Sequence, residues 1–140
     1  MSTETVLELL GHPFPKETRV DERVHRTILA GSSKALTRAW PLMGISHDHA
    51  ATVLGISRRT LERRLASGHF PLAEADRAYR IIHSYALAVD VLGSRQKARH
   101  WFHQSLAALG GRAPVESLTT EVDAACVREL LEQIEYGIYH

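Results

Sequence analysis

The clearest feature of the chain is a long amphipathic run over residues 72–92. Its apolar positions recur every three or four residues: Ala75, Ala78, Ile82, Tyr85 and Val89. This spacing places them on one face of an α-helix. Gly93 follows directly and ends the predicted helix, because glycine readily adopts the left-handed conformation that terminates helices.

Two shorter helices are predicted before this run, and local signals define their ends. Ser46 and Ser57 are credible N-caps for helices that extend to Leu54 and to about Ala66. A serine side chain can accept a hydrogen bond from a free N–H in the first turn, and a glycine can end the last turn. The glycines that close these two helices are Gly55 and Gly68.

Two helices of this length joined by a three-residue turn are typical of a helix-turn-helix motif. Ala51 is small where the helices would cross, while Leu61 and Leu65 would seat the second helix on the core. The second helix then exposes a strongly basic face. The candidate DNA-binding residues are Ser57, Arg58, Arg59, Thr60, Arg63 and Arg64.

The position of the first two arginines strengthens this hypothesis. Arg58 and Arg59 fall in the first turn of the helix, where the helix dipole disfavours positive charge. A phosphate or a guanine edge could supply the missing counter-charge. The alternative is a solvated basic face with no ligand.

The N-terminal part is less readable. Val6, Leu7, Leu9 and Leu10 favour a short helix, which the following glycine and prolines end. Residues 16–26 form either a linker or a second helix that packs through Val20, Val24 and Ile28. Ser33 is a plausible N-cap for a helix through Trp40, and Pro41 predicts a kink or a stop there.

Three further helices and one turn are predicted after residue 93. Residues 95–106 form a helix with apolar residues facing inward, and Gly110-Gly111 forms a turn. Pro114 begins a short helix that ends near Leu118. A last helix covers residues 122–134. The pattern therefore predicts an all-α protein.

Composition supports a folded helical protein. The chain is 44% hydrophobic and 24% charged, which is ordinary for a globular protein. No run is long and apolar enough for a membrane span, and the N-terminus lacks the basic leader of a signal peptide. We therefore expect a cytoplasmic protein. Its single cysteine, Cys126, allows no internal disulfide.

The net charge of +1 hides an uneven distribution. Residues 41–103 carry nine basic and five acidic groups, whereas residues 104–140 carry two basic and six acidic groups. The middle of the chain would therefore suit an anionic partner, and the last part a different one.

Enzymatic chemistry finds little support in the sequence. His47, Asp48 and His49 look like a metal triplet, but residues two apart point to nearly opposite sides of a helix. His100 and His103 share a face without a carboxylate at helical spacing. We expect no metal, no cofactor and no catalytic residue. A small metal-dependent hydrolase using His47, Asp48 or His100 remains the alternative from another class.

Several ordered motifs then point to a family. The run VLGSRQKARHWF over residues 91–102 leads to ALGGRAPVESL over residues 108–118, and IEYGIY covers residues 134–139. These resemble the toxin-binding domain of Xre/MbcA/ParS-type antitoxins. The preceding LGISRRTLERR resembles the DNA-binding half of the same family. The resemblance covers about residues 31–139.

The resemblance implies an antitoxin of a type II toxin-antitoxin system. Its partner would be a RES-domain toxin that consumes NAD⁺, and the complex would repress its own operon by binding operator DNA. The tail offers interface chemistry, since two tyrosines provide large apolar area and a hydroxyl. We expect the tail to enter or cover the NAD⁺ entrance, with Arg112 near the same surface. The candidate toxin-binding residues are Arg112, Glu135, Tyr136, Gly137, Tyr139 and His140.

We divide the chain into three regions on this basis. Residues 1–30 are an N-terminal extension of unknown role, residues 31–70 the helix-turn-helix region, and residues 71–140 a helical region for toxin binding and dimerisation. A homodimer is expected because one recognition helix buries too little surface for specific binding. The run over residues 72–92 is the first candidate for its seam, unless that run packs within one chain. The alternative function is a stand-alone dimeric transcriptional regulator.

Overall fold

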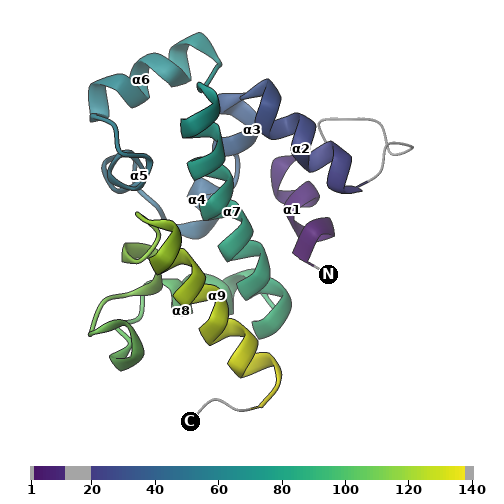
Figure 1. Cartoon of the computed structure of the whole chain (residues 1–140), viewed down its shortest axis with the longest axis vertical. Helices are drawn as coiled ribbons and strands as arrows, with labels where there is room; N and C mark the ends of the chain where they lie inside the picture. The colour runs from purple at the N-terminus through teal and green to yellow at the C-terminus, as the bar shows by residue number, and fades with distance from the viewer. Residues whose placement is uncertain (1, 12–19, 138–140) are drawn as a thin grey trace.

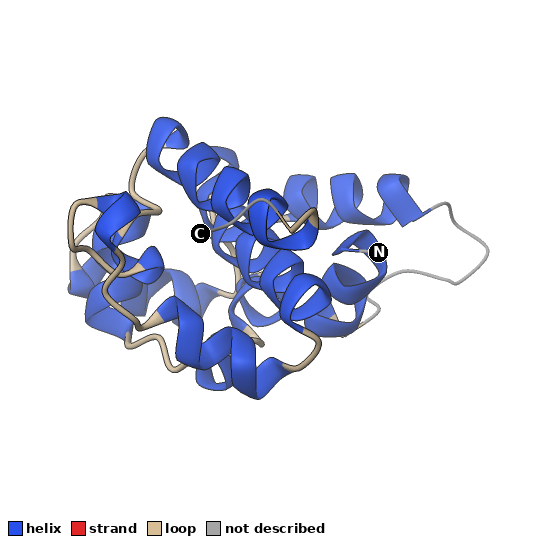
Figure 2. Cartoon of the chain, turned by 90° about the horizontal axis from the view of Figure 1, so that it is seen from below, coloured by secondary structure: helices blue, strands red, loops and turns tan. Residues whose placement is uncertain are grey.

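The computed structural model describes residues 2–11 and 20–137 of the chain, and not the side chains of residues 2–4 and 20. Regular structure in this part is helical, which confirms the predicted fold class; an isolated bridge joins Ser32 and His69 (Figure 2). None of the helices in this part is long and apolar enough to cross a bilayer. The helices are α1 Ser2–Leu10, α2 Val20–Ala30, α3 Ser33–Thr37, α4 Trp40–Met43, α5 His47–Leu54, α6 Arg58–Ser67, α7 Leu72–Leu92, α8 Arg95–Phe102 and α9 Glu121–Glu135, with short 3-10 turns η1 Ala107–Leu109 and η2 Pro114–Glu116.

The long helix α7 lies at the centre of the molecule (Figure 1). It packs against α1, α2, α3 and α5, and also against α8 and α9. Its buried side chains include Ala78, Ile81, Ile82 and Tyr85. The apolar face proposed as a dimer seam is therefore filled from within the chain, and α7 does not offer that face to a second copy.

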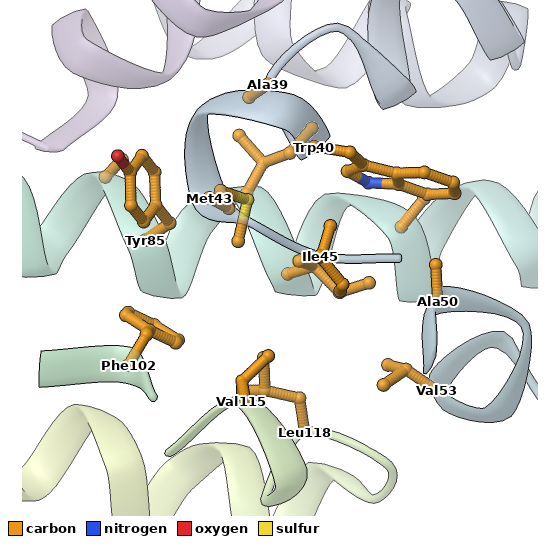
Figure 3. Packing of buried hydrophobic residues seen from close by; sticks show 14 of the residues in the cluster. Ala39, Trp40, Met43, Ile45, Ala50, Val53, Tyr85, Phe102, Val115 and Leu118 are labelled. Carbon is orange, nitrogen blue, oxygen red and sulfur yellow. The ribbon is translucent and has the colours of Figure 1, made fainter. Parts of the chain in front are cut away.

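One hydrophobic core joins the parts that the sequence suggested were separate. Met43 of α4 lies near Tyr85 of α7 (Figure 3). Trp40 of α4 and Phe102 of α8 belong to the same cluster. Val115 of η2 packs into the same cluster. The core therefore crosses the predicted boundary between residues 70 and 71 without interruption.

The N-terminal helices belong to this core. The apolar residues of α1 are buried and pack on α7, and Val24 of α2 is buried with them. The prediction of a short helix over residues 6–10 is confirmed, and of the two alternatives for residues 16–26 the described part, from residue 20, is helical. The prolines after Gly11 lie outside the described residues.

Several predicted helix ends that a capping residue defines agree with the structure. The predicted bounds of α7 agree with the structure, and α5 and α6 begin after Ser46 and Ser57. Two ends differ. Ser32, not Ser33, caps α3, because its Oγ accepts from Ala35 N at 3.2 Å.

The other difference concerns α8, which ends at Phe102 rather than at Leu106. The N–H of Leu106 donates to Arg112 O at 3.1 Å across the following loop, so it is not available to extend the helix. The break near Pro41 falls before it, since Pro41 occupies the first turn of α4, where its missing N–H is not needed.

Two loops meet beside the bridge and fix the end of α6. Phe70 N donates to Gly31 O at 2.8 Å, and Ser33 N donates to Gly68 O at 3.1 Å. Gly31 has φ +64°, and a Cβ built on it would lie 2.3 Å from Phe70 O. Only glycine fits this contact, which ties the C-terminal end of α6 to the start of α3.

Candidate functional site

Helices α5 and α6 form the predicted helix-turn-helix. Ser46 Oγ accepts from His49 N at 3.1 Å, and Ser57 Oγ accepts from Thr60 N at 3.0 Å. Gly55 ends α5 with φ +73°, a conformation that favours glycine. Both predicted caps and the turn are therefore confirmed.

The motif rests on the core and on α7. Ala51 and Leu61 are buried at the contact between the helices and the core, and Leu65 is half-buried. Arg77 of α7 donates from Nη1 to Leu54 O at 3.0 Å and so satisfies a carbonyl at the C-terminal end of α5. The exposed face of α6 is thus held in a fixed orientation.

Arg58 has a counter-charge within the chain. Its Nη1 lies 2.8 Å from Asp48 Oδ1, and its Nε lies 3.2 Å from Glu62 Oε1. The hydrogen bond to Asp48 raises the pKa of the Arg58 guanidinium above its ordinary value. Asp48 and Glu62 therefore give Arg58 a counter-charge within the chain, so its position in the first turn of α6 does not by itself require a phosphate or a base.

Arg64 is also paired, and more deeply. Its Nε lies 2.8 Å from Glu74 Oε1 and its Nη2 lies 3.0 Å from Glu74 Oε2, a bidentate pair between α6 and α7. The hydrogen bonds that Arg64 donates to Glu74 raise the pKa of the Arg64 guanidinium. Glu74 is only 9% exposed. This arginine joins the recognition helix to the core.

Arg59 and Arg63 differ from the other two arginines. Both are exposed and, within the part of the chain that the structure describes, neither makes an ion pair. They are four residues apart and therefore share one face of α6. Arg63 donates from Nη2 to Thr60 Oγ1 at 3.3 Å, and Thr60 Oγ1 also accepts from Ser57. The free positive charge of the motif is concentrated on these two side chains.

The contrast between Arg63 and Arg64 gives a test. We expect Arg64→Ala to lower the midpoint of thermal unfolding, because it leaves the nearly buried Glu74 carboxylate without its partner. It should leave the salt dependence of DNA binding almost unchanged. Arg63→Ala is the matched control: it should leave the midpoint of thermal unfolding almost unchanged and reduce the salt dependence of DNA binding. The salt slope is the slope of the logarithm of the DNA-binding constant against the logarithm of the salt concentration. If Arg64→Ala reduces the magnitude of this slope by about one, Arg64 contacts a phosphate after all.

Three of the four histidines considered as metal ligands have structural partners. His49 Nε2 lies 2.8 Å from Val115 O, and His103 Nε2 lies 2.8 Å from Met43 O, so each ring nitrogen donates to a carbonyl. His47 packs edge-on against Trp40. Among the described residues, no group of three potential metal ligands comes together.

The tail residues and Arg112 lie at opposite ends of α9. Tyr136 is 74% exposed after the last turn of α9, and Gly137 follows with φ +70°. Arg112 instead pairs with Asp123, in the first turn, at 3.5 Å. About 20 Å of helix separates the two at about 1.5 Å per residue. Arg112 therefore lies at the N-terminal end of α9, away from the tail.

Glu135 is exposed next to Tyr136, and Tyr139 and His140 lie outside the described residues. Sequence reasoning missed Asp48 and Glu74, which decide which arginines are free. No local signal marks them, since each lies ten residues from the arginine that it pairs with. The two ends of α9 thus form separate candidate surfaces.

Comparison with known proteins finds a family match for each half of the chain. Residues 23–83 match the family model described as an antitoxin Xre-like helix-turn-helix domain, and residues 87–137 match the antitoxin Xre/MbcA/ParS C-terminal toxin-binding domain. The two matches meet within α7, where the structure has one continuous helix.

Curated relatives named Antitoxin Xre show the same similarity. The one from Pseudomonas putida (strain KT2440) is 36% identical over 130 residues, which cover 91% of this chain and 76% of the relative. Those from Yersinia enterocolitica and Photorhabdus laumondii are each 34% identical, over 87 and 88 residues and 61% of this chain. These two alignments span 59% and 60% of the relatives' own length.

Proposed function

Because the chain belongs to the Xre family of antitoxins, we propose that it neutralises a RES-domain toxin and represses its own operon by binding DNA. The toxin would consume NAD⁺, and the chain itself would act in the cytoplasm without catalysing a reaction. The observation that carries the DNA-binding half is the pair Arg59 and Arg63, which is exposed on a capped helix and makes no ion pair among the described residues.

On the DNA, α6 would enter the major groove. Arg59 and Arg63 would contact phosphate oxygens, which position the protein, or guanine O6 and N7, which specify the sequence. Two copies would read paired half-sites one helical turn apart. Since α7 is enclosed within the chain, the contact between copies would involve a different surface.

The double variant Arg59→Ala/Arg63→Ala tests this proposal. We expect each arginine to be worth about 1–3 kcal/mol of operator affinity if it reads a base, and a drop of about one in the salt slope if it contacts a phosphate. Affinity would be measured by fluorescence anisotropy over a salt series. A double variant that binds with unchanged affinity and retains its helical circular dichroism would refute DNA binding through α6.

The control removes the same charge elsewhere. Arg26 and Arg112 lie outside the motif with side chains about half exposed. Arg26→Ala/Arg112→Ala should bind DNA nearly as well as the natural chain. Equal losses of DNA affinity in the two double variants would indicate a general effect of net charge and not a specific contact through α6.

On the toxin side, we propose that the tail after α9 enters or covers the NAD⁺ entrance of the toxin. The exposed Tyr136 ring supports this, because aromatic side chains are frequent anchors of protein interfaces. Glu135 adds negative charge, which suits a site built to hold the phosphates of NAD⁺. Arg112 would contact the toxin separately, at the other end of α9.

A further inference from the structure

A cationic cleft lies along α8, in the segment that matches the toxin-binding domain. It has a volume of about 640 Å³ and is lined by Gly44, Gln96, Arg99, His100, His103 and Gln104. We call it the α8 cleft. Among the described residues that line it there is no acidic side chain, and the Arg99 guanidinium and the two glutamine amides can donate hydrogen bonds into it.

Arg99 is seated in this cleft and has no counter-charge. A Cβ on Gly44 would lie 2.9 Å from both Nε and Nη2 of Arg99, so the guanidinium rests directly against the glycine backbone. Within residues 2–11 and 20–137, Arg99 makes no ion pair, and neither does the neighbouring Lys97. Arg95, one turn earlier, is 3.9 Å from Glu8.

The α8 cleft continues toward the helix-turn-helix. An adjoining hollow of about 300 Å³ shares Gly44 and His103 with it and reaches Ser46, the N-cap of α5. Glu116, the one acidic residue among the described residues that line this hollow, accepts a hydrogen bond from Ala113 N at 2.9 Å. The hollow thus leads from the α8 cleft to the N-terminal end of α5, where Asp48 pairs with Arg58 in the first turn of α6.

We propose that the α8 cleft binds a phosphate group of the DNA backbone, with Arg99 as its main ligand. In a helix-turn-helix complex the first helix passes the backbone while the second enters the groove. A strand that passes the N-terminal end of α5 would continue to Arg99, where a free guanidinium can hold a phosphate with two parallel hydrogen bonds. This inference rests on the proposed DNA binding by α6 and adds a contact from the other half of the chain.

The test compares Arg99→Gln with Arg95→Gln, a matched loss of charge one turn away on the same helix. The probe is a random-sequence DNA duplex of about 30 base pairs, roughly three helical turns, since phosphate contacts need no specific sequence. We expect Arg99→Gln to lower the salt slope by about 0.9 and to weaken binding about threefold to tenfold at low salt. Arg95→Gln should change neither, and Arg99→Lys should retain the slope.

Several outcomes would overturn the inference. If Arg99→Gln has the same DNA affinity and salt slope as Arg95→Gln while Arg59→Ala/Arg63→Ala still binds DNA more weakly, the α8 cleft does not contact DNA. The proposed function then stands. If the α6 double variant also binds normally, both ideas fail. NMR of the His100 and His103 rings gives a second readout. Shifts with inorganic phosphate but not with duplex DNA would mean an isolated anion site only.

Discussion

A chain that ends at Glu135 is expected to bind DNA as tightly as the full chain but to leave the toxin active. Tyr136 is exposed beyond the last turn of α9, so its removal opens no part of the core. If the tail supplies the central anchor of the interface, its loss should weaken toxin binding at least about 30-fold, or roughly 2 kcal/mol. The measurement is NAD⁺ consumption by the purified toxin with each form of the chain.

Two variants make this prediction specific. Tyr136→Ala should reproduce much of the loss, whereas Leu29→Ser, at an exposed position of α2, should inhibit normally. Operator binding serves as the control for folding. A truncated chain that still blocks NAD⁺ loss would assign neutralisation to another surface, with Arg112 and Asp123 as the next candidates.

The substitution Gly31→Ala should destabilise the fold by about 2–4 kcal/mol. Alanine is strained at φ +64°, and its Cβ would overlap Phe70 O at 2.3 Å, a backbone atom that cannot move aside cheaply. The hydrogen bond from Phe70 N to Gly31 O should lengthen or break as the loops separate. Urea unfolding followed by circular dichroism measures the change.

Gly68→Ala provides the control for this prediction. Gly68 also has a positive φ, +80°, but no atom lies within 4 Å of the position of its Cβ. Its replacement should therefore cost only the backbone strain, about 1–2 kcal/mol. Equal losses at both positions would show that the contact with Phe70 O contributes nothing beyond the dihedral angle.

Local chemistry explains which parts of the fold could be predicted from the sequence. The ends of α5 and α6 follow from Ser46, Gly55 and Ser57, because a cap and a left-handed glycine act on their own turn. The bounds of α7 follow from periodicity and Gly93. The family resemblance came from motifs of the same local kind, and both family matches agree with it.

The candidate site was harder to predict because ion pairs between helices determine which of its arginines are free. Six residues of the motif looked equivalent as DNA ligands, but Glu74 engages Arg64 and Asp48 engages Arg58 across helix contacts that spacing alone does not reveal. The distance between Arg112 and the tail was hidden for the same reason. Both lie in motifs of one domain, yet α9 places them at its two ends.

The central position of α7 also has a consequence for how the protein would be degraded. Helices from both matched domains pack on α7, and elements that share one core open together as a cooperative unit. A protease that engages the opened chain at α9 therefore also reaches the support beneath α6. Degradation would end repression and toxin inhibition in a single event, and no fragment able to hold the operator would outlive the part that holds the toxin.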